Sequence, residues 1–285
     1  MKKRFCYAFM LLAILLTLFA CSSTKKEDTT SLSGSYDIEQ FLDLLAPMFS
    51  VEESVPTYAT EEERTEFIAT ERQNALRSIG FKGGEEIILN GRLRVASVSR
   101  KNNISYLWIT DKDETEIVMI NGTAEIGWAS LLEDNTNIKV RFSVSENPDD
   151  KSLAFNNAEI LSPSSLKYKL NCSFSQTKKR VTAFGKIVDV IPITEAKAEL
   201  EQTAITEALD DPVWDIDLKY ATHLLTIEDD NKNRIAVLIR DADNSVFNTG
   251  DLIGCKGTVL EMNTKTYGNS FMDAGINFYF LSPQQ

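Results

Sequence analysis

The chain contains a single histidine, His223, in the segment Tyr220–Ile227, where a strand is expected to begin. One histidine without a Cys-x-x-Cys motif does not provide the ligands of a zinc site. The sequence also has no Gly-x-Ser-x-Gly elbow and no glycine-rich phosphate loop. We therefore expect His223 to be a structural residue, and we predict no catalytic residue, no metal site and no cofactor.

A short acidic segment resembles a calcium-binding loop more closely. Asp229, Asn231 and Asn233 have the spacing of its first three ligands. However, Arg234 takes the place of the turn glycine, and Arg240 takes the place of the closing glutamate. A hairpin turn between strands explains this segment better, and Asp111–Thr115 is the equivalent turn earlier in the chain.

Two more acids keep an enzymatic alternative open. Asp215 and Asp217 could serve an envelope hydrolase if both carboxylates were buried in a cleft with raised pKa values. Without a defined geometry they are read as solvated charges.

Four basic residues form a sharper candidate site. Arg92 and Arg94 alternate on one expected strand, and Lys139 and Arg141 alternate on another. Alternate residues of a strand point to the same face, so the four could form a basic patch for an acidic ligand. Their apolar neighbours are expected to face the core or to lie near it: Leu93, Val95, Val140 and Phe142.

Tyr106 and Trp108 also share one face of a strand. Such aromatic residues could form a binding surface, but core or rim positions are the more common outcome for them. We therefore expect these two side chains to belong to the core or its rim.

The charge balance limits the classes of partner. The chain has 30 Lys and Arg residues against 42 Asp and Glu, a net charge of −12. Loss of residues 1–20 would remove three basic residues and no acid, which leaves 27 against 42, or −15. A protein of this charge repels phosphate backbones, so we predict that nucleic acid is not a partner and disfavour single-strand binding.

The N-terminus has the layout of a secretory signal. Basic residues precede an apolar run from Phe5 to Ala20, which is followed by Cys21. The sequence Leu18-Phe19-Ala20-Cys21 resembles the lipobox of bacterial lipoproteins, although that family usually has a smaller residue at the position of Phe19. The resemblance implies cleavage after residue 20 and acylation of Cys21, with a polar tether over residues 21–35.

That resemblance also implies an address in the cell envelope. The protein is expected to meet the membrane through its N-terminal lipid. Ser22 and Ser23 lack the aspartate that often retains lipoproteins at the inner membrane, which favours the outer membrane. Two alternatives are an ordinary secretory signal and an uncleaved membrane anchor.

Of the four cysteines, Cys6 lies in the expected signal and Cys21 is the expected site of acylation. The other two are Cys172 and Cys255. In an oxidising compartment they could form a disulfide, and the alternative is two separate buried thiols.

Residues 36–80 are predicted to form an acidic helical segment. Asp37–Phe49 is amphipathic and is expected to end near Pro47, while Thr60 and Glu63 fit a capping box that opens a second helix. This segment holds ten acidic and three basic residues, which could be a solvated face or a docking surface for a basic partner.

Short β-rich runs follow, and they occur twice. Gly91–Val95 is matched by Gly185–Val190, and Leu107–Asp111 by Leu225–Asp229. A helical stretch of about 194–211 is inserted between the first two strands of the second copy. Later in the second copy, the segment Asn248–Val259 has the form of a Gly-Asp turn that leads into a strand.

These features resemble OB-fold domains, in particular the OB-like modules of bacterial envelope lipoproteins. The resemblance implies a mainly β protein with helical additions, made of two tandem five-stranded barrels over residues 81–163 and 172–285. We accordingly expect a non-catalytic, lipid-anchored module that binds protein, peptide or glycan.

Overall fold

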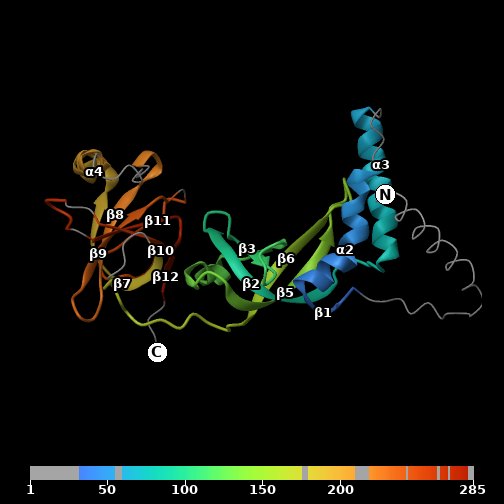
Figure 1. The fold of residues 1–285 in the computed structure, drawn as a ribbon, viewed down its shortest axis with the longest axis horizontal. Helices are drawn as coiled ribbons and strands as arrows, with labels where there is room; N and C mark the ends of the chain where they lie inside the picture. Colours follow the sequence, from blue (N-terminus) through green and yellow to red (C-terminus); the bar gives the residue numbers. More distant parts are fainter. Residues whose placement is uncertain are drawn as a thin grey trace, which may run out of the picture. The chain divides into compact units, whose positions relative to one another are not determined.

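The structure is a computed structural model that describes residues 32–54, 60–174, 179–208, 218–241, 243–261, 264–268 and 270–281. The chain divides into two units after Ser31, and every described residue belongs to the second unit. The signal and Cys21 lie outside the described residues. None of the described helices is long and apolar enough to cross a membrane. The described residues form two β-barrels with additional helices (Figure 1).

The first barrel follows the OB strand order. Its sheet runs in the order β4-β3-β2-β5-β6, so the long strand β2 pairs with both β3 and β5. The short strand β1 adds to β2 in parallel. The elements are β1 (Gly34–Asp37), β2 (Glu86–Ser99), β3 (Ile104–Thr110), β4 (Ile117–Gly122), the 3₁₀ helix η1 (Ala124–Leu131), β5 (Thr136–Glu146) and β6 (Leu153–Ser162).

The second barrel repeats this plan and closes on itself. Strand β11 pairs in parallel with β9 and antiparallel with β10, which completes the ring β11-β9-β8-β7-β10. The predicted fold of two tandem OB-like barrels after a helical segment is therefore confirmed. The elements are β7 (Arg180–Pro192), α4 (Ile193–Ala208), η2 (Leu218–Tyr220), β8 (His223–Glu228), β9 (Arg234–Ile239), β10 (Leu252–Glu261), β11 (Ser270–Gly275) and β12 (Phe278–Phe280).

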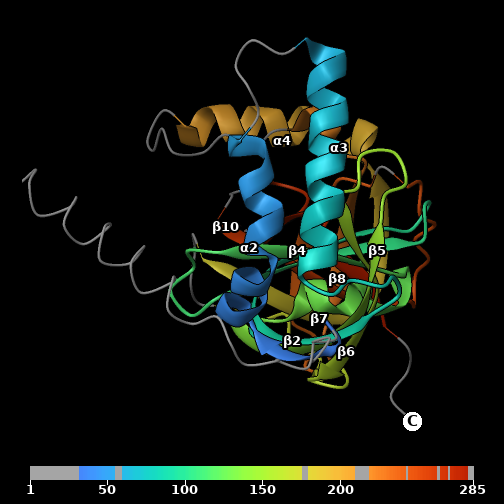
Figure 2. The same ribbon diagram turned by 90° about the vertical axis from the view of Figure 1, so that its right-hand side faces the viewer.

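Helices α2 (Ile38–Glu53) and α3 (Glu61–Ser78) run side by side next to the first barrel (Figure 2). The predicted capping box opens α3, because the Glu63 N–H donates to Thr60 Oγ1 at 3.3 Å and the Thr60 N–H donates to Glu63 Oε2 at 2.8 Å. The predicted end of α2 near Pro47 is wrong. The helix continues to Glu53 because Met48 and Val51 are buried in the core beyond the proline.

Each barrel has its own core. In the first, the helices supply Phe41, whose ring lies 5.7 Å from that of Phe142 and 5.4 Å from that of Phe155. In the second, Ile187, Val237 and other inward-facing strand residues pack together. A third cluster joins α4 to the outside of the second barrel, and it includes Ala196, Leu200, Leu224, Ala236 and Leu238.

The two barrels share a backbone irregularity in their first strand. In β2 the pairing with β3 shifts between Leu93 and Val95, and in β7 the pairing with β8 shifts between Ile187 and Asp189. Both shifts are β-bulges, which leave one residue unpaired and increase the local twist.

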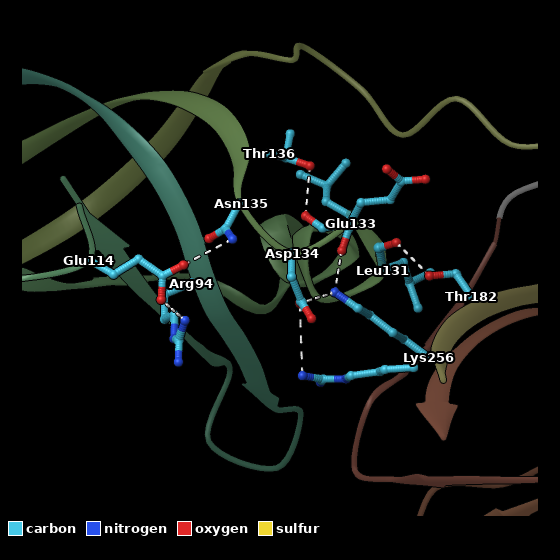
Figure 3. Close-up of polar contacts among 11 residues, drawn as sticks. Arg94, Glu114, Leu131, Glu133, Asp134, Asn135, Thr136, Thr182 and Lys256 are labelled. Carbon is cyan, nitrogen blue, oxygen red and sulfur yellow. Dashed lines mark hydrogen bonds and ion pairs between the residues drawn. The ribbon is translucent and has the colours of Figure 1, made fainter. Parts of the chain in front are cut away.

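The barrels contact each other through the segment that follows η1. Lys256 Nζ of β10 lies 2.6 Å from Asp134 Oδ1, and the Leu132 carbonyl accepts a second bond from the same ammonium group (Figure 3). Thr182 Oγ1 donates to the Leu131 carbonyl at 3.1 Å. Burial of Lys256 lowers the pKa of its ammonium group, while Asp134 acts against this shift.

Candidate ligand-binding face

The outer surface of β2, β3 and β4 in the first barrel is the strongest candidate for a ligand site. Two rows of side chains cross these three strands. The pairing places Val95, Trp108 and Met119 in one row. It places Ser97, Tyr106 and Asn121 in the next. We call these six residues the open face.

The row of Val95, Trp108 and Met119 is apolar and accessible. Val95 is 39% exposed and Met119 is 47% exposed. The bulge explains why Val95, expected at the core, lies outside: Arg94 and Val95 are both exposed, and the inward pattern resumes at Ala96. The expectation for Val95 was therefore wrong, whereas Leu93, Val140 and Phe142 are buried as expected.

Tyr106 and Trp108 stand on the outer face instead of the core face. Their strand neighbours Leu107 and Ile109 are fully buried, so the aromatic pair faces outward and remains half-buried. Their ring centroids are 5.9 Å apart with planes inclined at 35°. A core position is therefore wrong for both rings, and the rim part of the expectation is not contradicted. Aromatic rings beside polar groups are a common arrangement in OB ligand sites.

Asn121 adds a polar group beside Tyr106. Its amide nitrogen donates to Asn156 Oδ1 at 3.3 Å, which fixes the side chain against β6. Among the described residues, its buried Oδ1 atom has no hydrogen-bond partner. The open face thus combines an apolar row with a row of hydroxyl and amide groups.

The equivalent surface of the second barrel is only partly covered by the chain itself, because its first row of side chains lines an open groove of about 530 Å³. There the rows are Asp189, Thr226 and Ala236, followed by Ile191, Leu224 and Leu238. Ala196 and Leu200 of α4 pack against the second of these rows. The Thr266 N–H donates to Glu199 Oε1 of α4 at 2.8 Å, which joins the helix to the loop before β11.

The four predicted basic residues divide into two pairs. β2 and β5 are neighbours as expected, and Arg92 and Lys139 line one groove where these strands meet the start of α2. Arg94 and Arg141 have other partners. Arg94 forms an ion pair with Glu114, which also accepts a bond from Asn135 (Figure 3). Arg141 pairs with Glu159 of β6 at 2.9 Å. A single patch of four free cations is therefore not formed.

The two acidic turns are structural, in agreement with the hairpin interpretation. Asp111 accepts bonds from the Thr115 N–H and Thr115 Oγ1, both at 2.8 Å, and from the Glu116 N–H at 3.2 Å. Burial acts to raise the pKa of Asp111, but these hydrogen bonds outweigh it and hold the pKa at about 2.

Asp229 closes the corresponding turn of the second barrel. It accepts bonds from the Asn231 N–H at 2.8 Å and the Asn233 N–H at 2.9 Å. It also accepts a bond from the Cys172 N–H at 3.1 Å. Burial again acts to raise the pKa of this carboxyl, and the hydrogen bonds lower it overall.

Of the two possibilities for Cys172 and Cys255, the disulfide is not formed, and both residues are free buried thiols. Each belongs to the core of the second barrel. Burial raises the pKa of the Cys172 thiol to about 12 and raises that of Cys255 as well. They therefore correspond to the alternative of two small apolar core residues.

The remaining polar candidates are His223, Asp215 and Asp217. His223 begins β8 and packs edge-on against Phe247 at 5.0 Å. Asp215 and Asp217 lie outside the described residues. In the described part of the chain, no group of three or more histidine, cysteine or acidic residues could hold a metal ion.

The fold class of the described chain is a tandem of OB-like barrels, which is defined by its strand order. No protein-family model and no curated protein matches the chain. One similar solved structure, described as "Structural mimicry for functional antagonism", is 9% identical, covers 68% of this chain and 92% of its own, and has a TM-score of 0.26. Another, "drosophila Unr CSD456", is 11% identical, covers 70% and 63%, and has a TM-score of 0.23. At these TM-scores, neither similarity supports a conclusion about this chain.

Proposed function

We propose that this chain is a lipid-anchored, non-catalytic binding protein of the cell envelope, whose open face engages a peptide, protein or glycan. The observation that carries the proposal is the accessible row of Val95, Trp108 and Met119 beside the polar row of Ser97, Tyr106 and Asn121. Outer faces of the second and third strands are where OB folds bind their ligands.

The second barrel supports the same interpretation by contrast. Part of its equivalent surface is covered by α4, which removes the apolar side chains Leu224 and Leu238 from solvent, while the row of Asp189, Thr226 and Ala236 lines an open groove. The exposed apolar row of the first barrel does not stabilise the fold, because exposed apolar area is unfavourable in water. Ligand binding would explain why this row is accessible.

The charge of the protein narrows the choice of ligand. Its net charge of −12, or −15 after loss of residues 1–20, disfavours a polyanion such as a nucleic acid. A neutral glycan or a peptide pays no such electrostatic penalty. Aromatic rings next to hydroxyl and amide groups suit both of these ligand classes.

The anchor has its own test. Cys21→Ser is expected to move the protein from the membrane fraction to the soluble fraction, because acyl chains supply the membrane affinity. Mass spectrometry of the N-terminal peptide should show acylated Cys21 in the unaltered protein. An unprocessed N-terminus, or unchanged membrane attachment of the variant, would contradict the proposed anchor.

The open face is tested with two matched substitutions in the intact lipoprotein. Met119→Ser changes a residue of the open face that is 47% exposed, and Ile276→Ser changes one at 49% outside it. Cross-linked partners recovered from the native envelope should decrease at least about fivefold for Met119→Ser, since hot-spot side chains contribute about 1 kcal/mol or more. Equal recovery with both variants would eliminate the open face as the binding surface.

A further inference from the structure

A groove at the junction of β1, β2 and β5 forms a second candidate site, away from the open face. It has a volume of about 600 Å³, within the usual range of small-ligand pockets of roughly 300–1,000 Å³. The β-strand wall presents Arg92 and Lys139, while Asp37 and Glu39 line the groove where β1 leads into α2. The two sides therefore carry opposite charges.

The strand wall is ordered by cross-strand pairing. Arg92 lies opposite Asn137, and Asn90 lies opposite Lys139, so cationic and amide side chains alternate across β2 and β5. Arg92 Nη1 donates to the Lys112 carbonyl at 3.1 Å, which orients the guanidinium group. A guanidinium group held in this way is suited to carboxylate recognition by paired N–H donors.

Lys139 lies deeper in the sheet than the exposed lysines Lys101 and Lys112 of this barrel. It is half-buried in the middle of the sheet, between Asn90 and Ser162. No hydrogen bond or ion pair joins its ammonium group to any part of the chain that the structure describes. Arg94 and Arg141, which look equivalent in the sequence, are each paired with a glutamate. Lys112 also lines the groove and forms no ion pair with a described residue, so the groove contains three basic side chains whose charge remains available to a ligand.

The acidic side of the groove remains available as well. Asp111 also lines it, but that carboxylate already accepts hydrogen bonds from its own turn. Asp37 and Glu39 are exposed at the start of α2 and form no ion pair with a described residue. Asp37 is also the N-cap of α2 and forms a capping box with Gln40, so Glu39 is the less engaged of the two carboxylates. The helix N-terminus carries about half a positive charge, which two full carboxylate charges outweigh.

We propose that this groove binds a zwitterionic ligand of amino-acid or short-peptide size, with its carboxylate at Arg92 and Lys139 and its ammonium group at Asp37 and Glu39. A simple anion meets repulsion from the two acids, and a simple cation meets repulsion from the two bases. Only a ligand with both charges compensates both sides of the groove, and discrimination of this kind depends on repulsive as well as attractive elements.

The experiment titrates the mature lipoprotein in detergent with three probes: free trialanine, N-acetyl-trialanine and trialanine amide. Isothermal calorimetry at low salt should detect binding of the free tripeptide at millimolar concentrations. Blocking either end should weaken binding by about tenfold, because each block removes one charge pair. Absence of binding by free trialanine, or equal binding of a blocked form, would overturn the proposal.

Variants locate the binding in the groove. Lys139→Gln should weaken binding of free trialanine by about tenfold, while Arg141→Gln, on the same strand but paired with Glu159, should leave it within about twofold. If Lys139→Gln does not fold, the exposed residue Glu39 offers Glu39→Gln, with the same expected loss. An unchanged affinity in the folded groove variant overturns the assignment. Met119→Ser should leave trialanine binding intact, so this proposal and that for the open face fail independently.

Discussion

The two barrels are built on one plan, and they differ in what covers their outer faces. In both, the first strand contains a β-bulge and a matching glycine. In both, the second strand leads into a turn that is closed by a buried aspartate. The first barrel receives α2 in its core and leaves the open face accessible. The second receives α4 on its outside. A helix added to the same barrel can therefore complete the core or cover part of the outer surface, depending on where it is inserted.

The largest expected effect tests the role of α2 in the first barrel. Phe41→Ala should destabilise this barrel by about 3–5 kcal/mol, because a fully buried ring that contacts Phe142 and Phe155 is lost. Hydrogen exchange read by mass spectrometry should show the loss in β2–β6, with β7–β11 retained. Phe49→Ala on the same helix is the control, since Phe49 is 57% exposed and should change stability by less than about 0.5 kcal/mol.

The role of α4 is tested by Leu200→Ala. Leu200 is 2% exposed, and its truncation should cost about 2–3 kcal/mol, at the lower end of the range for such changes because a surface helix is able to readjust. Exchange should then increase in α4 and on β8 and β9, with the first barrel unchanged. Lys197→Ala should have little effect, since Lys197 only pairs with Glu201 at the surface. Full protection of α4 in Leu200→Ala would contradict its proposed covering role.

The matched glycines test how deep the similarity of the barrels goes. A methyl group on Gly91 would lie 2.9 Å from the Thr110 carbonyl oxygen, and one on Gly185 would lie 3.0 Å from the Glu228 carbonyl oxygen. Gly91→Ala and Gly185→Ala should therefore each cost about 1–3 kcal/mol in urea unfolding. If only one of the two variants loses stability, then the two barrels do not share the close approach of their first two strands.

The sequence allowed much of this plan to be predicted, because strand alternation, turn residues and the capping box of Thr60 are local signals. The β-bulge was not predictable from alternation, and it moved Val95 outward. The partners of Arg94 and Arg141 depend on strand register, which the sequence does not specify alone. The exposed row that includes Met119 was missed, although the alternation of Ile117 and Met119 with buried Val118 and Ile120 was a usable signal.

The smallest effect concerns the two buried aspartates. The pKa of each is lower in the folded chain than the usual value of about 3.9, so each stabilises the fold fully above about pH 4. This contribution is lost as pH falls, through about pH 2 for Asp111. Asp111→Asn and Asp229→Asn should reduce the urea midpoint at pH 7 and flatten its decrease between pH 4 and pH 2.

Asp111→Asn and Asp229→Asn should also differ in how far their effects extend from the turn. Within the described part of the chain, Asp111 accepts bonds from its own turn and from the adjacent Thr110, whereas Asp229 also accepts the Cys172 N–H, which lies 57 residues away in the sequence. Exchange protection at Cys172 should therefore fall in Asp229→Asn and remain unchanged in Asp111→Asn. If both variants lose protection only within their own turns, then the bond to Cys172 contributes nothing to the second barrel, and the two turns are equivalent in energy as well as in form.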